Sequence, residues 1–261
     1  IVFGDWSSDV CSSDLLKSLF PKVREFFFDD DTFTANLPRA REIARKLAPL
    51  GVTWSCNSRA NLDLDTVKLL RDSGLRLFLV GYESGSEEIL RRIKKGIGLE
   101  EMRRFTRACH EAGVIIHGTF ILGLPVETPE TIEQTLRFAQ ELDVFSIQVS
   151  LAAPYPGTEL YETARQHGWF ARNDKAATLQ EDGFQDCALE YPGLDREAIF
   201  EAVERFYRGY FLRPRPILRI LKTMLEDKQI FVRRCREGYE FFRSLRQRKT
   251  AAAGVRSRSR R

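Results

Sequence analysis

Strand-like apolar runs alternate with helix-like amphipathic stretches along the chain, and this alternation limits the possible folds more than any other feature. The strand-like runs cover residues 23–28, 52–58, 77–80, 114–122 and 145–151, and helix-like stretches cover residues 37–50, 64–73, 87–93, 100–112 and 131–142. Strands separated by helices pair in parallel through right-handed crossovers. The sequence therefore predicts an α/β fold with a parallel sheet, either doubly wound or closed into a barrel.

Polar residues inside two of the strands favour the barrel. Within residues 145–151, Ser146, Gln148 and Ser150 fall on one face of the strand, and apolar residues fall on the other. Residues 52–58 alternate in the same way. A doubly wound sheet buries both of its faces, so its strands are continuously apolar. We therefore predict a partial, TIM-like barrel with a polar interior.

Turn sequences rich in acidic residues, glycine or proline follow four of the strands. They are DDDTFT at residues 29–34, ESGS at 83–86, GLPVET at 123–128 and PYPGT at 154–158. In sheets of this kind, ligands bind at the carboxyl ends of the strands. A structural alternative is helix capping by Asp29–Asp31, or by Ser84 or Ser86, because these residue types are preferred N-caps.

In this order and spacing, the turns resemble those of the radical S-adenosylmethionine (radical SAM) barrel, and in particular its cobalamin-binding branch. The resemblance covers residues 16–169 for the barrel. The segments HGTFILGLP (residues 117–125), QVSLAAPYPGT (148–158) and RRCREGYEFFRSLRQRK (233–249) extend it to the radical SAM proteins associated with hopanoid biosynthesis.

The resemblance implies S-adenosylmethionine, a [4Fe–4S] cluster and cobalamin as cofactors. The cluster of that family is held by a C-x-x-x-C-x-x-C loop after the first barrel strand, and this sequence contains neither that motif nor a cobalamin domain. The five cysteines, Cys11, Cys56, Cys109, Cys187 and Cys235, stand far apart. We therefore expect a partial barrel without its first strand, no metal ligand and no catalytic residue in this chain, and no activity from the chain alone.

The candidate cofactor-binding residues are those that could hold S-adenosylmethionine. The ligand's ammonium and sulfonium need acceptors, which Asp29, Asp30, Asp31 and Glu83 could supply, and its carboxylate needs a donor such as the Arg59 guanidinium. The resemblance places the aspartates and Glu83 near the methionine amino group or ribose. It also places the Gly123 turn near the adenine. The full candidate set is Asp29, Asp30, Asp31, Arg59, Glu83, Ser84, Gly123, Gln148 and Ser150.

Structural alternatives stay open for several of these residues. Arg59 could pair with Asp63 or Asp65, and Gln148 and Ser150 could simply fill the barrel. His117, in the middle of a strand, is more readily explained as a hydrogen-bonded core residue than as an acid or base. Val126 stands where related proteins have glycine, so this turn either keeps ordinary φ angles or is strained.

The sequence also suggests how the chain is divided. Residues 1–15 contain DWSSDVCSSDL, which resembles a translated sequencing adapter, so we expect an unstructured artefact there. We expect the partial barrel over residues 16–169, an irregular linker over 170–194, and a helical region over 195–249 that includes helices at 196–212, 217–226 and 230–248. Residues 250–261 are expected to be a disordered basic tail.

Charge is unevenly distributed and bears on possible partners. Residues 208–261 hold 17 Lys and Arg against 4 Asp and Glu, a net charge of +13, whereas the first 207 residues carry −9. A basic tail is often only a solvated surface, but it is also attracted to anionic membranes. The scattered cysteines are typical of a reduced cytoplasmic compartment, so a cytoplasmic protein touching the inner face of the membrane is expected.

The resemblance implies a function for the complete protein. It indicates hydrogen abstraction from a hopanoid head group through a 5′-deoxyadenosyl radical, with formation of the cyclitol ether of bacteriohopanetetrol. A hopanoid lipid is then the substrate, and no nucleic-acid partner is expected. Two alternatives remain at this point: a radical SAM methylthiotransferase or methyltransferase that acts on RNA, and a non-catalytic adaptor at the membrane surface.

Overall fold

The structure is a computed structural model that describes residues 19–170 and 187–226. The predictions for residues 1–15, for a helix at 230–248 and for the tail at 250–261 lie outside the described residues. The chain divides into two compact units, residues 1–151 and 152–261. The predicted domain boundaries differ from this division and stay predictions.

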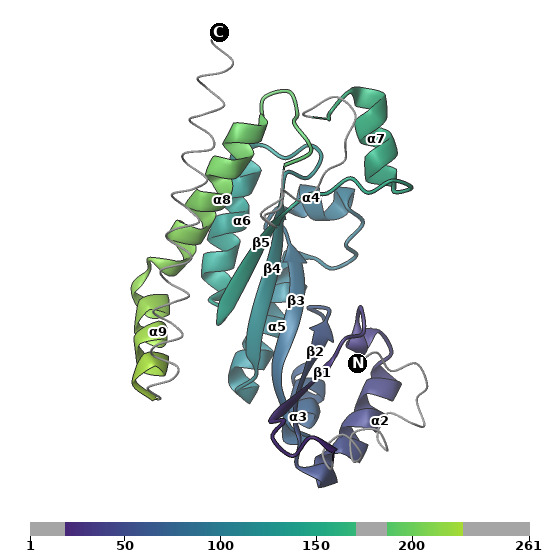
Figure 1. The fold of residues 1–261 in the computed structure, drawn as a ribbon, viewed down its shortest axis with the longest axis vertical. Coiled ribbons are helices and arrows are strands. Elements are labelled where there is room, and N and C mark those ends of the chain that lie inside the picture. The colour runs from purple at the N-terminus through teal and green to yellow at the C-terminus, as the bar shows by residue number, and fades with distance from the viewer. Residues whose placement is uncertain (1–18, 171–186, 227–261) are drawn as a thin grey trace. The chain divides into compact units, whose positions relative to one another are not determined.

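The first unit contains a five-stranded parallel sheet (Figure 1). Its strands are β1 (Glu25–Phe28), β2 (Thr53–Ser58), β3 (Leu75–Glu83), β4 (Ile115–Leu122) and β5 (Ser146–Leu151). They pair in sequential order, each with the next, and all four pairings are parallel. Sequential order is the arrangement of a barrel, whereas a doubly wound sheet reverses its order at a switch point. The predicted partial-barrel fold is confirmed.

Helices connect successive strands, as predicted. They are α2 (Leu37–Leu47), followed by the short 3-10 helix η2 (Ala48–Leu50), then α3 (Leu64–Asp72), α4 (Glu87–Arg92), α5 (Leu99–Ala112) and α6 (Pro129–Leu142). Another 3-10 helix, η1 (Phe33–Ala35), precedes α2. Side chains cap several of these helices: Asn36 caps α2, Asp63 caps α3, and Thr128 forms a capping box with Thr131 at the start of α6.

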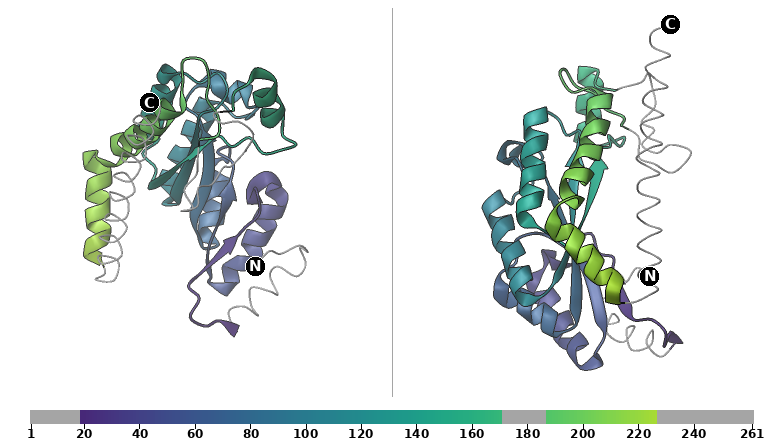
Figure 2. Two further views of the ribbon diagram at one scale, coloured as in Figure 1. Left: turned by 45° about the horizontal axis from the view of Figure 1, so that its top comes forward. Right: turned by 90° about the vertical axis from the view of Figure 1, so that its left-hand side faces the viewer.

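One face of the sheet carries the core. Figures 1 and 2 show α3, α5 and α6 along this face. Phe78 packs on Phe105 of α5, and Tyr82 packs edge-on against Phe138 of α6 while its hydroxyl bonds Thr106 at 2.6 Å. The opposite face is only half-buried along β3 and β4, where every second residue is partly accessible. On β5 this face carries the predicted polar residues Ser146, Gln148 and Ser150. On β3 and β4 it is mixed, with apolar Leu77, Leu79, Ile115 and Ile121 beside Glu83, His117 and Thr119, so the polar interior that the sequence predicts is observed only in part.

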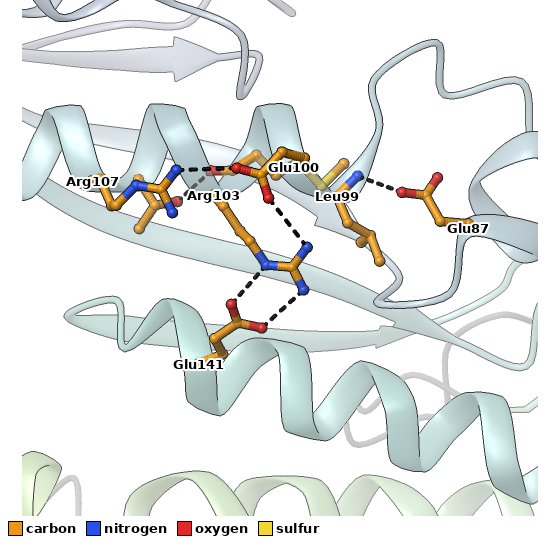
Figure 3. A network of polar contacts seen from close by, with 8 residues as sticks. Glu87, Leu99, Glu100, Arg103, Arg107 and Glu141 are labelled. Atoms are coloured by element: carbon orange, nitrogen blue, oxygen red, sulfur yellow. Dashed lines mark hydrogen bonds and ion pairs between the residues drawn. The ribbon is translucent and has the colours of Figure 1, made fainter.

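Ion pairs link α5 to its neighbours at the surface (Figure 3). The Arg103 guanidinium donates to both carboxylate oxygens of Glu141 in α6, at 2.6 and 3.0 Å, and also lies 3.7 Å from Glu100. The backbone N–H of Leu99 donates to the Glu87 carboxylate at 2.9 Å. Exposed pairs of this kind each contribute at most about 1 kcal/mol, so the apolar contacts beneath them hold the helices in place.

The second unit contains α7 (Glu159–His167), α8 (Arg196–Phe211) and α9 (Pro214–Glu226). Helix α7 was not predicted from the sequence, although it has recognisable ends. The Thr158 side chain accepts from the Tyr161 N–H, and Gly168 closes the helix in the left-handed region. The helices predicted at 196–212 and 217–226 are present with slightly different ends. No helix in the described parts of the chain is long and apolar enough to cross a membrane.

Candidate functional site

The candidate residues lie along one edge of the sheet. Because all strands run parallel, their carboxyl ends meet at the same edge. Asp29–Asp31 follow β1, Arg59 follows β2, Glu83 ends β3, and Gly123 follows β4. Ser150 lies near the end of β5, whereas Gln148 lies in the middle of that strand, opposite Thr119 of β4. The topology therefore places most of the predicted set at one edge, although which of these residues bind a ligand stays a prediction.

Glu83 is held in an unusual backbone conformation. Its φ is +65°, and the Ser84 N–H donates to the Tyr82 carbonyl across it at 2.9 Å, so Glu83 is the centre of a three-residue turn. The β3–β4 pairing shifts register between Gly81 and Glu83. A Cβ at Gly81 would lie 2.3 Å from the Glu83 Oε1 atom. The carboxylate thus folds back over Gly81, at a backbone cost of about 1–3 kcal/mol that is typical of functional sites.

The folded-back carboxylate belongs to a charged cluster of three residues, Arg59, Glu83 and Lys95. Lys95 Nζ lies 2.9 Å from Glu83 Oε1, and these side chains are 17% and 18% exposed. The Arg59 guanidinium donates to the Lys95 carbonyl at 2.7 Å. The cluster therefore presents two cations and one carboxylate that a small charged ligand can reach. The alternative pairing of Arg59 with Asp63 is not what the structure shows, since Asp63 caps α3 and lies 3.9 Å from Arg41.

Lys95 is a site residue that was not predicted from the sequence. It comes from the Lys94–Lys95–Gly96 segment after α4, where Lys94 has a φ of +55° and Gly96 a φ of +70°. These angles turn the chain back toward the edge of the sheet. The sequence signal that could have pointed to Lys95 is a basic residue next to a glycine, in the segment that follows the ESGS turn and its helix. Lysine is, however, also a common surface residue near the carboxyl end of a helix, so the signal is weak.

The three aspartates after β1 differ in their surroundings. Asp30 forms an ion pair with Arg39 at 2.6 Å, and its carbonyl accepts from the Asn57 side chain at 2.8 Å. Asp29 and Asp31 are exposed. None of them caps α2, because Asn36 does so, and the capping alternative is therefore wrong. Asp29 and Asp31 are therefore the more accessible members of this group, and Asp30 is already paired with Arg39.

Ser84 is part of a buried contact between the β3–α4 turn and α6. Its hydroxyl lies 3.1 Å from the Thr135 hydroxyl and accepts from the Ser86 N–H at 3.2 Å. The Gly85 N–H also donates to the Thr135 hydroxyl, at 3.0 Å. Ser86 occupies the N-cap position of α4 without a side-chain capping bond. Ser84 is fully buried, so in this conformation it supports the turn that carries Glu83.

The turn after β4 is built around a buried carboxylate. Glu127 Oε2 accepts from the backbone N–H groups of Gly123 and Leu124, at 2.6 and 3.2 Å. Its Oε1 atom is buried and has no hydrogen-bond partner among the described residues. Burial raises the pKa of Glu127 to about 7, against the smaller lowering effect of the two N–H donors. Our sequence analysis read GLPVET as a turn but did not find this residue.

Val126 shows how this turn accommodates the missing glycine. Its φ is +62°, in the left-handed region that a β-branched residue rarely enters. Of the two possibilities raised by the sequence, the strained turn is therefore the one observed.

Strands β4 and β5 add polar groups to the half-buried face. His117 Nδ1 lies 2.8 Å from the Ser146 hydroxyl, its partner across the strands, and burial lowers the pKa of His117. The Gln148 amide donates to Ser150 at 3.3 Å, and Gln148 is exposed. His117 is hydrogen-bonded, as predicted, but half-buried. Gln148 also hydrogen-bonds the His117 side chain, and its exposed position lets a ligand on this face reach it.

The described cysteines do not form a metal site. Cys56, Cys109 and Cys187 are buried free thiols in separate elements of the chain, and burial raises the pKa of Cys56 and Cys109, so both remain protonated. No group of three His, Cys, Asp or Glu residues that could hold a metal ion occurs in residues 19–170 and 187–226. The described residues therefore do not fit an iron–sulfur cluster.

Comparison with known proteins identifies the fold and the domain. The family model for the radical SAM superfamily matches residues 14–139, just under half of the chain. The match implies S-adenosylmethionine and a [4Fe–4S] cluster as cofactors of a domain of this kind.

Individual relatives have methyltransferase names. The chain is 30% identical over 221 residues to an uncharacterized methyltransferase, PH0819, of Pyrococcus horikoshii, covering 83% of this chain and 46% of that protein. It is 24% identical over 161 residues to a hopanoid C-2 methylase of Rhodopseudomonas palustris, covering 57% of this chain and 30% of the relative.

A solved structure has the same fold. The radical SAM methyltransferase TsrM of Kitasatospora setae, with cobalamin and a [4Fe–4S] cluster bound, matches with a TM-score of 0.65 and 19% identity, over 78% of this chain and 46% of that one. The chain thus spans less than half the length of each of these three proteins.

The carboxyl edge fits S-adenosylmethionine better than it fits the cluster. The Arg59–Glu83–Lys95 cluster offers partners for both the carboxylate and the amino group of the methionine moiety. Because Gly81 has no side chain, the Glu83 carboxylate can occupy the space beside it.

Proposed function

We propose that the complete protein is a radical SAM methyltransferase that uses cobalamin and acts on a hopanoid lipid. The observation that carries the proposal is the half-buried Glu83–Lys95 pair beside Arg59, at the carboxyl edge of a sheet whose sequence matches the radical SAM superfamily. Support for cobalamin comes from the fold shared with TsrM, and support for the substrate from the hopanoid C-2 methylase among the relatives.

In this proposal the chain's own residues bind and orient the cofactor. The Lys95 ammonium and the Arg59 guanidinium pair with the methionine carboxylate, and Glu83 accepts from the amino group or the ribose hydroxyls. Asp29 and Asp31 add acceptors, the Gly123 turn approaches the adenine, and Gln148 and Ser150 face the ribose or the substrate. S-adenosylmethionine, when bound, supplies the methyl group. The strained turn keeps Glu83 in position without a ligand, which reduces the entropy lost on binding.

The experiment is methyl transfer by the complete protein, extended upstream to its cluster-binding segment and loaded with cluster and cobalamin. S-adenosylmethionine with a deuterated methyl group is incubated with the enzyme and a hopanoid extract, and the lipids are analysed by mass spectrometry. We expect the label on a hopanoid, with a loss of about tenfold or more in Glu83→Gln and little change in Glu88→Gln, an exposed glutamate on α4.

Other products would overturn the proposal in distinguishable ways. An unlabelled cyclitol ether on the head group is the product that the sequence resemblance suggests. It would support a hopanoid as the substrate but would refute methyl transfer. Label on RNA would refute the lipid substrate. Unchanged hopanoids and unchanged RNA would refute both.

A further inference from the structure

Helix α9 in the second unit is amphipathic in a way that nothing in the cofactor site explains. Its apolar side chains recur at spacings of one, three and four residues, which places them on one side of a helix. Basic residues lie on the other side, and the only acidic residue is at its carboxyl end. The apolar set is Ile217, Leu218, Ile220, Leu221 and Met224, and the basic set is Arg215, Arg219 and Lys222.

The apolar side of α9 is accessible. Leu218 is 65% exposed, Leu221 49%, Ile217 40% and Ile220 37%. These four large aliphatic side chains lie within five consecutive residues, about 6 Å along the helix axis, because a helix rises about 1.5 Å per residue, and they form one contiguous strip. A scattered exposed leucine needs no explanation, but a strip of this kind marks an interaction surface.

The start of α9 is fixed to α8. The Arg213 Nε–H donates to the Tyr210 carbonyl at 3.0 Å, and the guanidinium lies 4.8 Å from the centre of the Tyr210 ring. Tyr210 is fully buried, so the junction has a firm anchor. Two prolines, Pro214 and Pro216, lie in the first turn, where their missing N–H groups cost nothing. The first turn of α9, from which the apolar strip begins, is therefore held in place against α8.

We propose that α9 docks onto an anionic phospholipid surface, with its apolar strip in the interface and its basic side against the headgroups. The positive charge of this region selects this occupant, because residues 208–261 carry a net charge of +13. A second copy of the chain would bring one strongly positive region against another. RNA would use the charge but would leave the apolar strip in water. An anionic bilayer satisfies both sides of the helix.

The test is flotation of the 261-residue chain with vesicles. Neutral vesicles contain phosphatidylcholine alone, and anionic vesicles contain phosphatidylcholine and phosphatidylglycerol. We expect binding to anionic vesicles only, and about tenfold or more weaker binding for Leu218→Gln/Leu221→Gln. Arg215→Gln should weaken binding about fivefold, and more salt should weaken it in the wild type. The matched control is Leu19→Gln/Phe20→Gln, which changes two equally exposed apolar residues in the first unit and should leave binding unchanged.

Three results would overturn the proposal. Anionic-vesicle binding that is unchanged in Leu218→Gln/Leu221→Gln would mean that the charged tail binds without α9. Tight binding to transfer RNA with no vesicle binding would assign the surface to nucleic acid. A dimer in sedimentation velocity that dissociates in the same variant would assign the strip to a second copy. Circular dichroism of each variant separates loss of binding from loss of folding.

Discussion

Replacing Gly85 with alanine is expected to lower the free energy of unfolding by about 3 kcal/mol or more. A Cβ at this buried position would lie 2.6 Å from the Phe138 Cβ and 2.7 Å from backbone atoms of Gln134 and Thr135 in α6. Backbone atoms of a helix cannot rotate away as a side-chain end can. The helix would have to shift, which would also break the hydrogen bond between the Gly85 N–H and the Thr135 hydroxyl.

Denaturant unfolding followed by circular dichroism measures this effect. Gly98→Ala is the matched control, because its Cβ would be 3.5 Å from the Glu87 carboxylate and its φ is −91°, so its effect should stay below about 1 kcal/mol. If Gly85→Ala were as stable as Gly98→Ala, then α6 would not rest directly on the turn that carries Glu83.

Stability should fall between pH 4.5 and pH 7 because of Glu127. Its pKa is about 7 in the folded protein and 4.5 without the fold. Between these values the folded chain keeps a proton that the unfolded chain has released, so raising the pH favours unfolding. The contribution is fully present below pH 4.5 and is lost above pH 7. This difference between the two pKa values corresponds to about 3 kcal/mol in the free energy of unfolding.

Glu127→Gln should remove most of this pH dependence. The glutamine oxygen can still accept from Gly123 and Leu124, and the side chain never becomes charged. We expect the variant to be about 1–3 kcal/mol more stable than wild type at pH 8, with a smaller difference at pH 5. Urea unfolding at both values measures it, with Glu88→Gln as the exposed control. A Glu127→Gln variant that loses stability at pH 8 would show that the negative charge itself holds the turn.

The fold was predictable because periodicity reports burial directly. Alternating side chains in residues 145–151 identified a strand with one wet face, and that choice separated a barrel from a doubly wound sheet. Helix α7 was missed because only one of its residues, Ala164, is buried, so its sequence has little apolar periodicity. Its ends depend on local capping, which the pattern of strands and helices did not draw attention to.

The sequence predicted where in the fold the candidate site lies, but not which of its side chains contact one another. A carboxylate after β3 and an arginine after β2 had to lie at the same edge once the strands were parallel. The partner that joins them, Lys95, depends on left-handed angles at Lys94 and Gly96, which residue type alone does not fix. Glu127 was missed for a related reason: its burial is created by a turn in which a valine adopts a φ that its sequence disfavours.

The central claim is that the carboxyl edge of this sheet binds S-adenosylmethionine through Glu83 and Lys95. The most direct test is isothermal titration calorimetry of S-adenosylmethionine with the complete, cluster-loaded protein, comparing wild type, Glu83→Gln, Lys95→Met and Glu88→Gln. Loss of one charge-assisted contact should weaken binding by about tenfold or more in the first two variants and leave Glu88→Gln unchanged. Equal affinities in all four proteins would contradict the claim and leave the Glu83–Lys95 pair a purely structural contact.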